Sequence, residues 1–308
     1  MVTGSDEICE TEQTTPIHHH TCASMITREC ITQWANCIKA RKFTINDSYS
    51  IGPIINLTNL LQCIFKTQEK PAPQQSWFRG YHFIFNCQMN QQLGSDGYDN
   101  YQAPVTDNHH QLYLRRLWAR GTIQFIQPPK VNSALTCTEQ VQKVKPFNED
   151  VFVDIERKFT SEEHELLLVE NRTMLYTNQL YAPNKAPKLS ENEPGITFKL
   201  SPIDLLKYSM LTYNLHRIHF DPKYAHSIEN LPTLLVHGPL QVTLILYYFS
   251  LQHPKLIPHQ LKYRTYDPFF VNEEAGISIT AKGSNEFQLT LFNAVHKTVY
   301  LQGTLKCK

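Results

Sequence analysis

A run of mostly apolar residues limits the folds that this chain can adopt. Residues 239–251 read PLQVTLILYYFSL, interrupted by Gln241 and Thr243. The run is too short to span a bilayer, which takes roughly 20 apolar residues. The preceding Gly238 and the Pro239 that opens the run are typical of the start of a helix. Because this helix would be apolar nearly all round, we expect it to be buried at the centre of a packed core.

The composition is that of a globular protein without a generally charged partner. The 308 residues suggest about two domains. Lys plus Arg number 29 and Asp plus Glu number 28, so the net charge is +1 and nothing indicates nucleic acid. No Gly-rich nucleotide loop and no metal-ligand cluster occurs, so we expect neither a cofactor nor a metal. The eight cysteines form no C-x-x-C pair and are expected to be reduced thiols.

The amino-terminal segment differs from the rest of the chain. Residues 1–27 contain no Lys or Arg and include several acidic residues, which is the reverse of an Arg-rich presequence. We expect a disordered tail or a targeting region there. From Met25 onward the chain becomes basic, and apolar residues follow at helical spacing, which fits either a presequence that starts at Met25 or the first helix of the fold.

The hydrophobic pattern predicts the same order of elements twice, helix and then antiparallel strands. In the first half, 54–65 is expected to be a helix and 81–85 a short strand. In the second half, 203–211 and 222–228 are expected to be helical and to precede the buried helix. Longer strands are expected at 113–126, 134–144, 151–159 and 166–177, and then at 259–265, 277–281, 287–292 and 298–305.

This order predicts an α+β protein with two copies of one unit. We expect the first unit at 28–178, a linker rich in Asn, Pro, Lys and Glu at 179–198, and the second unit at 199–308. The copies are not alike in sequence, so the repeat rests on the order of elements alone.

A polar motif lies ahead of the apolar run. Residues 213–221 read YNLHRIHFD, and His237 follows eighteen residues after His219, directly before Gly238. A histidine beside amide and carboxylate groups can transfer protons near neutral pH, because its unperturbed pKa is about 6.5. Amides at a helix start lack partners and carry partial positive charge, so they can hold an oxyanion. The motif therefore predicts chemistry next to a carbonyl group.

These residues carry a resemblance to a known family. Residues 209–214 read SMLTYN, 216–221 read HRIHFD and 235–239 read LVHGP, and this series resembles the motif of MaoC-like (R)-specific hydratases and dehydratases. More narrowly, the chain resembles the fungal mitochondrial 3-hydroxyacyl-thioester dehydratase type 2 proteins. The segments 93–97, LGSDG, and 114–121, LRRLWARG, support this with moderate specificity. The resemblance covers roughly residues 30–306.

The resemblance implies a double hotdog fold, in which each curved antiparallel sheet wraps one long helix. It also implies the reversible loss of water from a (3R)-3-hydroxyacyl thioester, which gives the trans-2-enoyl thioester, in mitochondrial type II fatty acid synthesis. The substrate would be carried on acyl carrier protein or coenzyme A. Two such chains could form a homodimer, and a mitochondrial location is implied as well.

The resemblance also implies roles for the site residues. His219 occupies the position of the catalytic histidine, and the amide of Gly238 is the candidate oxyanion donor. Simpler members of the family have an aspartate five residues before the histidine, where this chain has Asn214. Because an amide is a poor proton acceptor, Asn214 is expected to orient water or the hydroxyl. His219 then performs both proton transfers, or it shares them with His216 or Asp221.

Other residues near the motif have a structural alternative beside a role in substrate binding. His216 and His237 are expected either to contact the substrate or to brace the turn. Arg217 is expected either to form a salt bridge within the motif or to hold a phosphate. Asp221 before Pro222 is typical of a helix cap.

Arg115, Arg116 and Arg120 form the densest basic cluster of the sequence. They are expected to be either the exposed end of a strand or a surface that binds an acidic carrier protein or the phosphates of coenzyme A.

Two other functions compete with the dehydratase, because hotdog scaffolds host several activities. A hotdog thioesterase would need a nucleophile or a carboxylate that activates water at the pocket, and Asp221 is the only nearby candidate. A non-catalytic acyl-thioester-binding protein is the second alternative, since the usual aspartate is replaced by Asn214.

Overall fold

The computed structural model describes residues 28–69, 73–87, 93–106, 110–183, 186–190 and 195–308. The predicted tail 1–27 lies outside these residues. Within them, no helix is both long enough and apolar enough to cross a membrane. Among the described residues, Cys37, Cys63, Cys87, Cys137 and Cys307 are free thiols.

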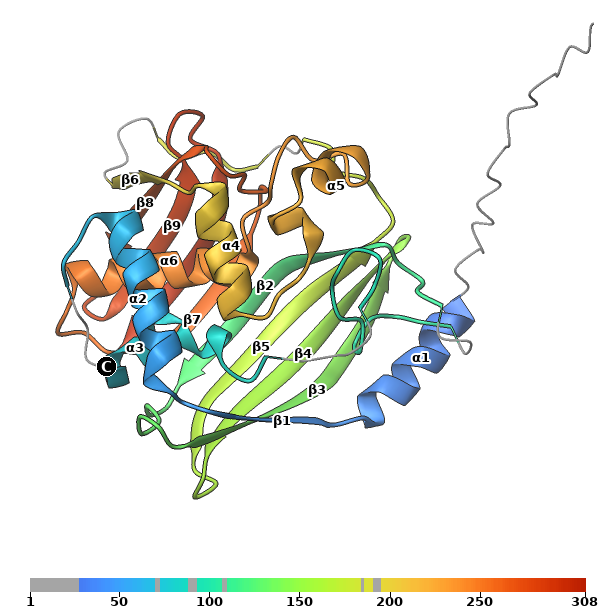
Figure 1. Ribbon diagram of the computed structural model, residues 1–308, viewed down its shortest axis with the longest axis horizontal. Helices are drawn as coiled ribbons and strands as arrows, with labels where there is room; N and C mark the ends of the chain where they lie inside the picture. Colours follow the sequence, from blue (N-terminus) through green and yellow to red (C-terminus); the bar gives the residue numbers. More distant parts are fainter. Residues whose placement is uncertain (1–27, 70–72, 88–92, 107–109, 184–185, 191–194) are drawn as a thin grey trace, which may run out of the picture.

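One antiparallel sheet of ten strands forms the body of the molecule (Figure 1). Its strand order is β1-β3-β4-β5-β2-β7-β10-β9-β8-β6. The first five strands are β1 (Phe43–Ser48), β2 (Arg115–Phe125), β3 (Ala134–Phe147), β4 (Asp150–Ser161) and β5 (Leu166–Thr177). The last five are β6 (Ile196–Lys199), β7 (Pro258–Thr265), β8 (Glu274–Ala281), β9 (Glu286–Asn293) and β10 (Val299–Cys307).

The sheet consists of two halves with the same internal order, joined where β2 pairs with β7. The order β1-β3-β4-β5-β2 of the first half is repeated as β6-β8-β9-β10-β7 in the second. The predicted repeat and the predicted α+β class are therefore confirmed. β6 begins at Ile196, so the last residues of the predicted linker 179–198 form the first strand of the second half.

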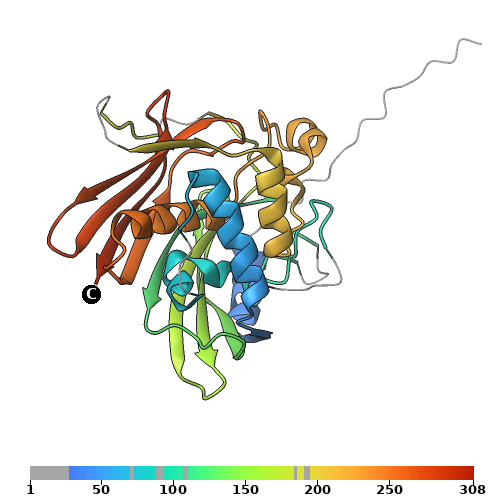
Figure 2. The same cartoon turned by 60° about the vertical axis from the view of Figure 1, so that its left-hand side comes forward.

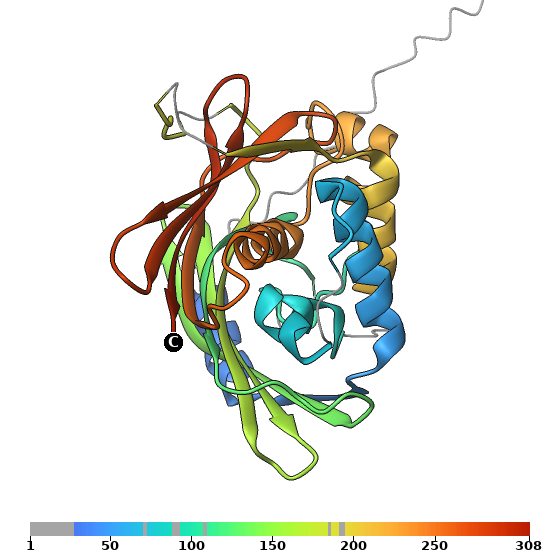
Figure 3. The ribbon, with the colours of Figure 1, turned by 90° about the vertical axis from the view of Figure 1, so that its left-hand side faces the viewer.

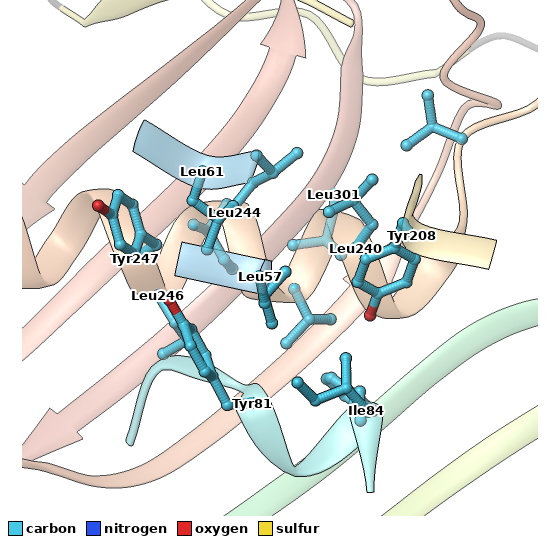
Figure 4. Packing of buried hydrophobic residues seen from close by; sticks show 14 of the residues in the cluster. Leu57, Leu61, Tyr81, Ile84, Tyr208, Leu240, Leu244, Leu246, Tyr247 and Leu301 are labelled. Carbon is cyan, nitrogen blue, oxygen red and sulfur yellow. The ribbon is translucent and has the colours of Figure 1, made fainter. Parts of the chain in front are cut away.

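The predicted apolar helix is α6 (Gly238–Gln252), and all of its residues from 240 to 250 except Tyr248 are buried. Figure 3 shows α6 end-on, with the sheet curved around it. Leu240, Leu244, Leu246 and Tyr247 of α6 share one core with residues of the surrounding elements (Figure 4). A helix that is apolar on every side is stable here because protein covers every side of it.

The remaining helical elements cover this core. They are α1 (Arg28–Ala40), α2 (Ile51–Phe65), α3 (Pro73–Ser76), η1 (Trp77–Arg79), η2 (Tyr81–Ile84), α4 (Pro202–Leu211), η3 (Arg217–His219) and α5 (Pro222–Ser227). Figure 2 shows α2 and α4 side by side on the face of α6 that the sheet leaves open. Ser201 and Asp204 cap α4 reciprocally, which fixes where this helix begins.

The predicted strand at 81–85 is wrong, because Tyr81–Ile84 forms the 3₁₀ helix η2. Gly80 precedes it with φ of 83°, a left-handed conformation that turns the chain between η1 and η2. A Cβ on Gly80 would lie 3.1 Å from Oγ1 of Thr243, so this turn packs closely against α6. Contacts with α6 therefore outweigh the strand propensity of the local sequence.

A buried group of charged residues supports β2 from inside the first half. Arg157 donates to Glu139 (2.6 Å) and to Glu170 (3.2 Å), and Arg172 donates to Glu170 (2.7 Å). Burial by itself would raise the pKa of the Glu170 carboxyl, but Arg172 and Arg157 outweigh it and bring the pKa to about 2. The guanidinium of Arg172 also lies 4.7 Å from the ring centre of Trp118 in β2, and so the group positions this ring.

Candidate active site

A cavity of about 400 Å³ lies where the two halves of the sheet meet. The first half contributes residues of β2, β5 and the segment that follows β5. The second half contributes η3, the residues before α6, the start of α6 and the end of β7. The lining side chains include Leu117, Trp118, Leu175, Leu180 and Tyr181 from the first half, and Asn214, His216, His219, His237, Gly238 and Tyr266 from the second. The cavity therefore collects most of the predicted site residues.

The motif 213–221 folds as a series of local turns after α4. Tyr213 has φ of 49°, and the amide of Asn214 donates to the carbonyl of Ser209 (2.9 Å), which ends α4. The side-chain oxygen of Asn214 accepts from the amide of His216 (3.0 Å). Asp221 accepts from the amide of Tyr224 (3.0 Å), so the predicted helix cap at Asp221 is confirmed. Between the end of α4 and the cap at Asp221 lies η3, which carries His219.

His219 is held with one ring nitrogen occupied and the other available. Its Nδ1 lies 2.7 Å from the carbonyl oxygen of Leu235, which can only accept, so Nδ1 carries the proton. No hydrogen bond to Nε2 is formed by the described residues, and the side chain lines the cavity. Burial lowers the pKa of His219 to about 4, although the bond to Leu235 opposes this shift. His219 is therefore neutral at pH 7, with a free lone pair on Nε2.

His237 fixes the ring of His219 from the side. The two rings are stacked with their centres 3.6 Å apart. His237 Nε2 lies 2.9 Å from the hydroxyl of Ser209 in α4, and burial holds the pKa of His237 well below its usual range. A second charged ring at this distance would repel a protonated His219, so a neutral His237 permits His219 to take up a proton during a reaction.

Gly238 places the start of α6 against the first half of the molecule. The first backbone bond of the helix is from the amide of Gln241 to the carbonyl of His237 (3.1 Å), so the Gly238 amide has no partner within the helix. A Cβ on Gly238 would lie 2.5 Å from Cγ of Trp118. Trp118 itself donates to the hydroxyl of Tyr263 (3.0 Å). Only glycine fits this contact. It brings to the cavity wall, beside His237, an amide that none of the described residues bonds.

Asn214 and His216 complete the polar wall. The Asn214 oxygen is bound to the backbone of His216, so the amide nitrogen of Asn214 is the group left for a ligand. His216 Nε2 lies 3.6 Å from Oδ2 of Asp96, and Asp96 pairs with Arg116. Burial, Arg116 and His219 lower the pKa of His216 well below its usual range. His216 is therefore a second neutral histidine in the cavity.

Two of the three arginines of the predicted basic cluster are held by the protein itself, whereas Arg120 is exposed. Arg115 pairs with Glu229 and donates to the carbonyl of Asn178 (3.0 Å). Arg116 pairs with Asp96 and donates to the carbonyl of Asp99 (2.7 Å). Both line the cavity, but their side chains are largely buried.

Arg217 lies outside the cavity lining and donates to Asp221 (2.8 Å), which is the salt bridge considered as one alternative from the sequence. Among the described residues, no group of three or more His, Cys, Asp or Glu side chains is arranged to hold a metal.

Several residues that shape the site were not among the sequence candidates. Trp118, Ser209 and Asp96 act through contacts with residues that lie far away in the chain. Trp118 and Asp96 fall in the two first-half segments that carry the family resemblance, LRRLWARG and LGSDG. Their location in these two segments was the only indication in the sequence that Trp118 and Asp96 matter, and it predicted no role for either side chain.

Comparison with known proteins identifies the family. A family model described as hydroxyacyl-thioester dehydratase type 2 matches residues 80–271. The hydroxyacyl-thioester dehydratase type 2, mitochondrial, of Schizosaccharomyces pombe is 30% identical over 235 residues, which cover 67% of this chain and 78% of the relative. The chain belongs to the hydroxyacyl-thioester dehydratase type 2 family. The family predicted from the sequence is thus confirmed.

Two further relatives agree with this assignment. The Saccharomyces cerevisiae protein of the same name is 28% identical over 245 residues, covering 74% of this chain and 86% of the relative. A mesaconyl-C(4)-CoA hydratase of Chloroflexus aurantiacus is 28% identical over 191 residues, covering 58% and 65%.

Solved structures show the fold of the family. A MaoC-like dehydratase from Phytophthora capsici superposes with a TM-score of 0.67 at 14% identity, covering 88% of this chain and 96% of the other. A conserved hypothetical protein of Mycobacterium tuberculosis, described as a double hotdog, superposes with a TM-score of 0.52 at 12% identity, covering 89% and 97%. The predicted double hotdog fold is confirmed.

Replacement of Gly238 tests the contact between the halves. We expect Gly238→Ala to destabilise the protein by about 1–3 kcal/mol, because a methyl group would overlap with Trp118. Gly283→Ala is the matched control, since no atom lies within 4 Å of a Cβ at Gly283, and it should change stability by less than about 0.5 kcal/mol. Urea denaturation measures both. Equal stability of the two variants would contradict the account of this contact.

Proposed function

We propose that this protein catalyses the reversible dehydration of (3R)-3-hydroxyacyl thioesters to trans-2-enoyl thioesters in mitochondrial type II fatty acid synthesis. The observation that carries the proposal is a neutral His219, its Nε2 free in the cavity, close to the unpaired amide of Gly238 at the start of α6. The class of enzyme, a hydro-lyase, agrees with the hydratase and dehydratase relatives.

In the dehydration direction, Nε2 of His219 takes the proton from C2 of the acyl group. The electron pair of that C–H bond moves toward the thioester carbonyl, and the amide of Gly238 stabilises the negative charge that develops on the oxygen. The C3–O bond then breaks, and the hydroxyl leaves with the proton from His219 as water. The double bond forms between C2 and C3, and His219 is returned to its neutral form.

Asn214 and His216 complete this mechanism without taking up the proton from C2. The amide nitrogen of Asn214 binds the oxygen of the hydroxyl or of the water. An amide suffices at this position because His219 performs both proton transfers. His216 forms the neighbouring wall, and its lowered pKa keeps a second positive charge away from the protonated His219.

The substrate is an acyl thioester, and we infer that acyl carrier protein carries it in the cell, with coenzyme A thioesters as usable substitutes. The predicted mitochondrial location is confirmed by the two fungal relatives, both of which carry "mitochondrial" in their names. Association of two chains as a homodimer stays a prediction.

The thioesterase alternative loses the carboxylate on which it depended. Asp221 caps α5 and pairs with Arg217, and it is not among the residues that line the cavity. The non-catalytic alternative is tested by the replacements that follow.

Replacement of His219 tests the proposal directly. We expect His219→Ala to lower kcat for the hydration of a crotonyl thioester by about 10³-fold, because both proton transfers are lost. His226→Ala is the control, since His226 is an exposed histidine of α5 outside the cavity, and it should keep full activity. Circular dichroism checks the fold of each variant.

Asn214 variants in the same assay separate orientation from proton transfer. Asn214→Ala should lower kcat about tenfold, since one hydrogen bond to the reacting oxygen is lost. Asn214→Asp keeps an oxygen that can accept from the His216 amide, so a large gain in activity with this variant would show that a base at this position is missing. An unmodified protein that is inert toward both coenzyme A and carrier-protein thioesters would exclude the enzymatic proposal.

The pH dependence of activity follows from the buried histidine. Because the pKa of His219 is about 4 in the folded protein, the base stays neutral through pH 6.5, and kcat/KM for dehydration should fall only as the pH approaches about 4. Stability behaves differently. In the unfolded chain His219 has its ordinary pKa of about 6.5. Below about pH 6.5 the unfolded state therefore binds more protons than the native state, and the native state loses stability as the pH falls toward 4.

Rates measured between pH 4.5 and 8, with the folded fraction followed by fluorescence at each pH, separate the two effects. Loss of kcat/KM with a midpoint near pH 6.5 in fully folded protein would contradict the assignment of His219.

A further inference from the structure

Three cationic side chains gather on the outer face of the sheet at the joint between its halves. Arg120 of β2 lies directly opposite Arg264 of β7, and Lys262 lies two residues from Arg264 on the same face. All three side chains are exposed. Figure 1 shows this joint, where β2 and β7 run together through the middle of the sheet. We call Arg120, Lys262 and Arg264 together the anion cluster, because their cationic side chains attract anions.

This arrangement is unfavourable by itself, because like charges directly opposite each other on neighbouring strands destabilise a sheet. Within the described part of the chain, none of the three side chains has a carboxylate within ion-pair distance. Arg120 donates to the hydroxyl of Thr173 (3.3 Å), and Arg264 lies 5.2 Å from the ring centre of Tyr266. Neither contact is an ion pair, although the hydroxyl of Thr173 itself donates to the carboxylate of Asp154 (2.6 Å). Three cationic side chains beside this one carboxylate keep the anion cluster net positive toward an external anion.

The anion cluster lies at one end of the cavity. β2 and β7 pair from Gln124 and Gln260 up to Arg120 and Arg264, and no further. Beyond this pair the hydroxyl of Thr265 donates to the carbonyls of Trp118 (2.5 Å) and Ala119 (2.9 Å), and Leu117, Trp118, Thr265 and Tyr266 line the cavity. Arg264 contacts the ring of Tyr266, which itself lines the cavity.

The position of the anion cluster contrasts with that of the other arginines near the site. Arg115 and Arg116 are buried and bound to Glu229 and Asp96, so their charges are already neutralised. Asp267 also lines this end of the cavity, and burial together with Glu273 raises the pKa of its carboxyl.

We propose that Arg120, Lys262 and Arg264 bind the phosphate of the 4′-phosphopantetheine arm that carries the acyl group. The inference rests on the proposed function, since coenzyme A and carrier proteins both present acyl thioesters on this arm. The thioester would lie at Gly238 and His219, and the arm would leave the cavity past Leu117 and Tyr266 toward the outer face of the sheet. Arginine suits this role because its planar guanidinium binds two phosphate oxygens at once.

The test compares three crotonyl thioesters that differ only beyond the pantetheine. Crotonyl-pantetheine has no phosphate, crotonyl-4′-phosphopantetheine has one, and crotonyl-coenzyme A has the nucleotide as well. For Arg120→Ala and for Arg264→Ala we expect KM to rise about tenfold with the two phosphorylated thioesters and to stay unchanged with crotonyl-pantetheine, at constant kcat. Lys306→Ala is the matched control, because Lys306 is a cation of the same sheet that already pairs with Glu286.

Two further measurements make the outcome decisive. Calorimetric binding of 4′-phosphopantetheine and pantetheine gives the same comparison without turnover, so it applies even if the protein is inert and the proposed function fails. Urea denaturation should show unchanged or increased stability for both arginine variants, since each relieves repulsion.

Loss of stability with equal loss of affinity for all three thioesters would make the cluster structural and overturn the proposal. Unchanged affinity for all three would also overturn it. An effect confined to crotonyl-coenzyme A would assign the cluster to the nucleotide instead of the pantetheine phosphate.

Discussion

The contact between Trp118 and Gly238 is the constraint on which the site depends. It joins β2 of the first half to the start of α6 in the second, and it leaves no room for a side chain on the glycine. Trp118 is held in turn by the hydroxyl of Tyr263 and by Arg172. The position of the free amide at the start of α6 is therefore fixed from both halves, and neither half alone would define it.

Burial gives the polar wall its chemical character. Three histidines lie close together, and burial lowers the pKa of each, so the group is uncharged at neutral pH. Each ring is nevertheless oriented differently, His219 by a backbone carbonyl, His237 by Ser209 and His216 by Asp96. A low dielectric and fixed orientation together strengthen the effect of each hydrogen bond on a charge that develops in the cavity.

The sequence predicted those elements whose pattern reflects burial directly. The eight long strands and α6 fall close to their predicted positions, because alternation and continuous apolarity follow from which faces are covered. The edge strands β1 and β6 gave no such signal, since each has a single buried residue. The strand predicted at 81–85 was wrong because its residues pack against α6, which lies far away in the sequence, and form a 3₁₀ helix there.

The sequence predicted some residues of the candidate site and missed the partners that hold others. The motif around His219 could be identified because its residues are neighbours in the chain, and the structure brings Asn214, His216, His219, His237 and Gly238 to one cavity. The partners of Arg115 and Arg116 could not be identified, because Glu229 and Asp96 lie on other segments. Cross-strand register, which places Arg120 opposite Arg264, is likewise a tertiary property.

The two halves share one strand order, yet they are unequal partners. In the second half the buried helix α6 begins at the cavity wall, whereas the first half packs α2 and the short turn η1 against α6 from outside. In the cavity between them, the second half supplies the three histidines and the Gly238 amide, and the first half supplies the opposite wall with Trp118. The proposed chemistry therefore places its reacting groups on the second half and leaves the first half to shape the cavity around them.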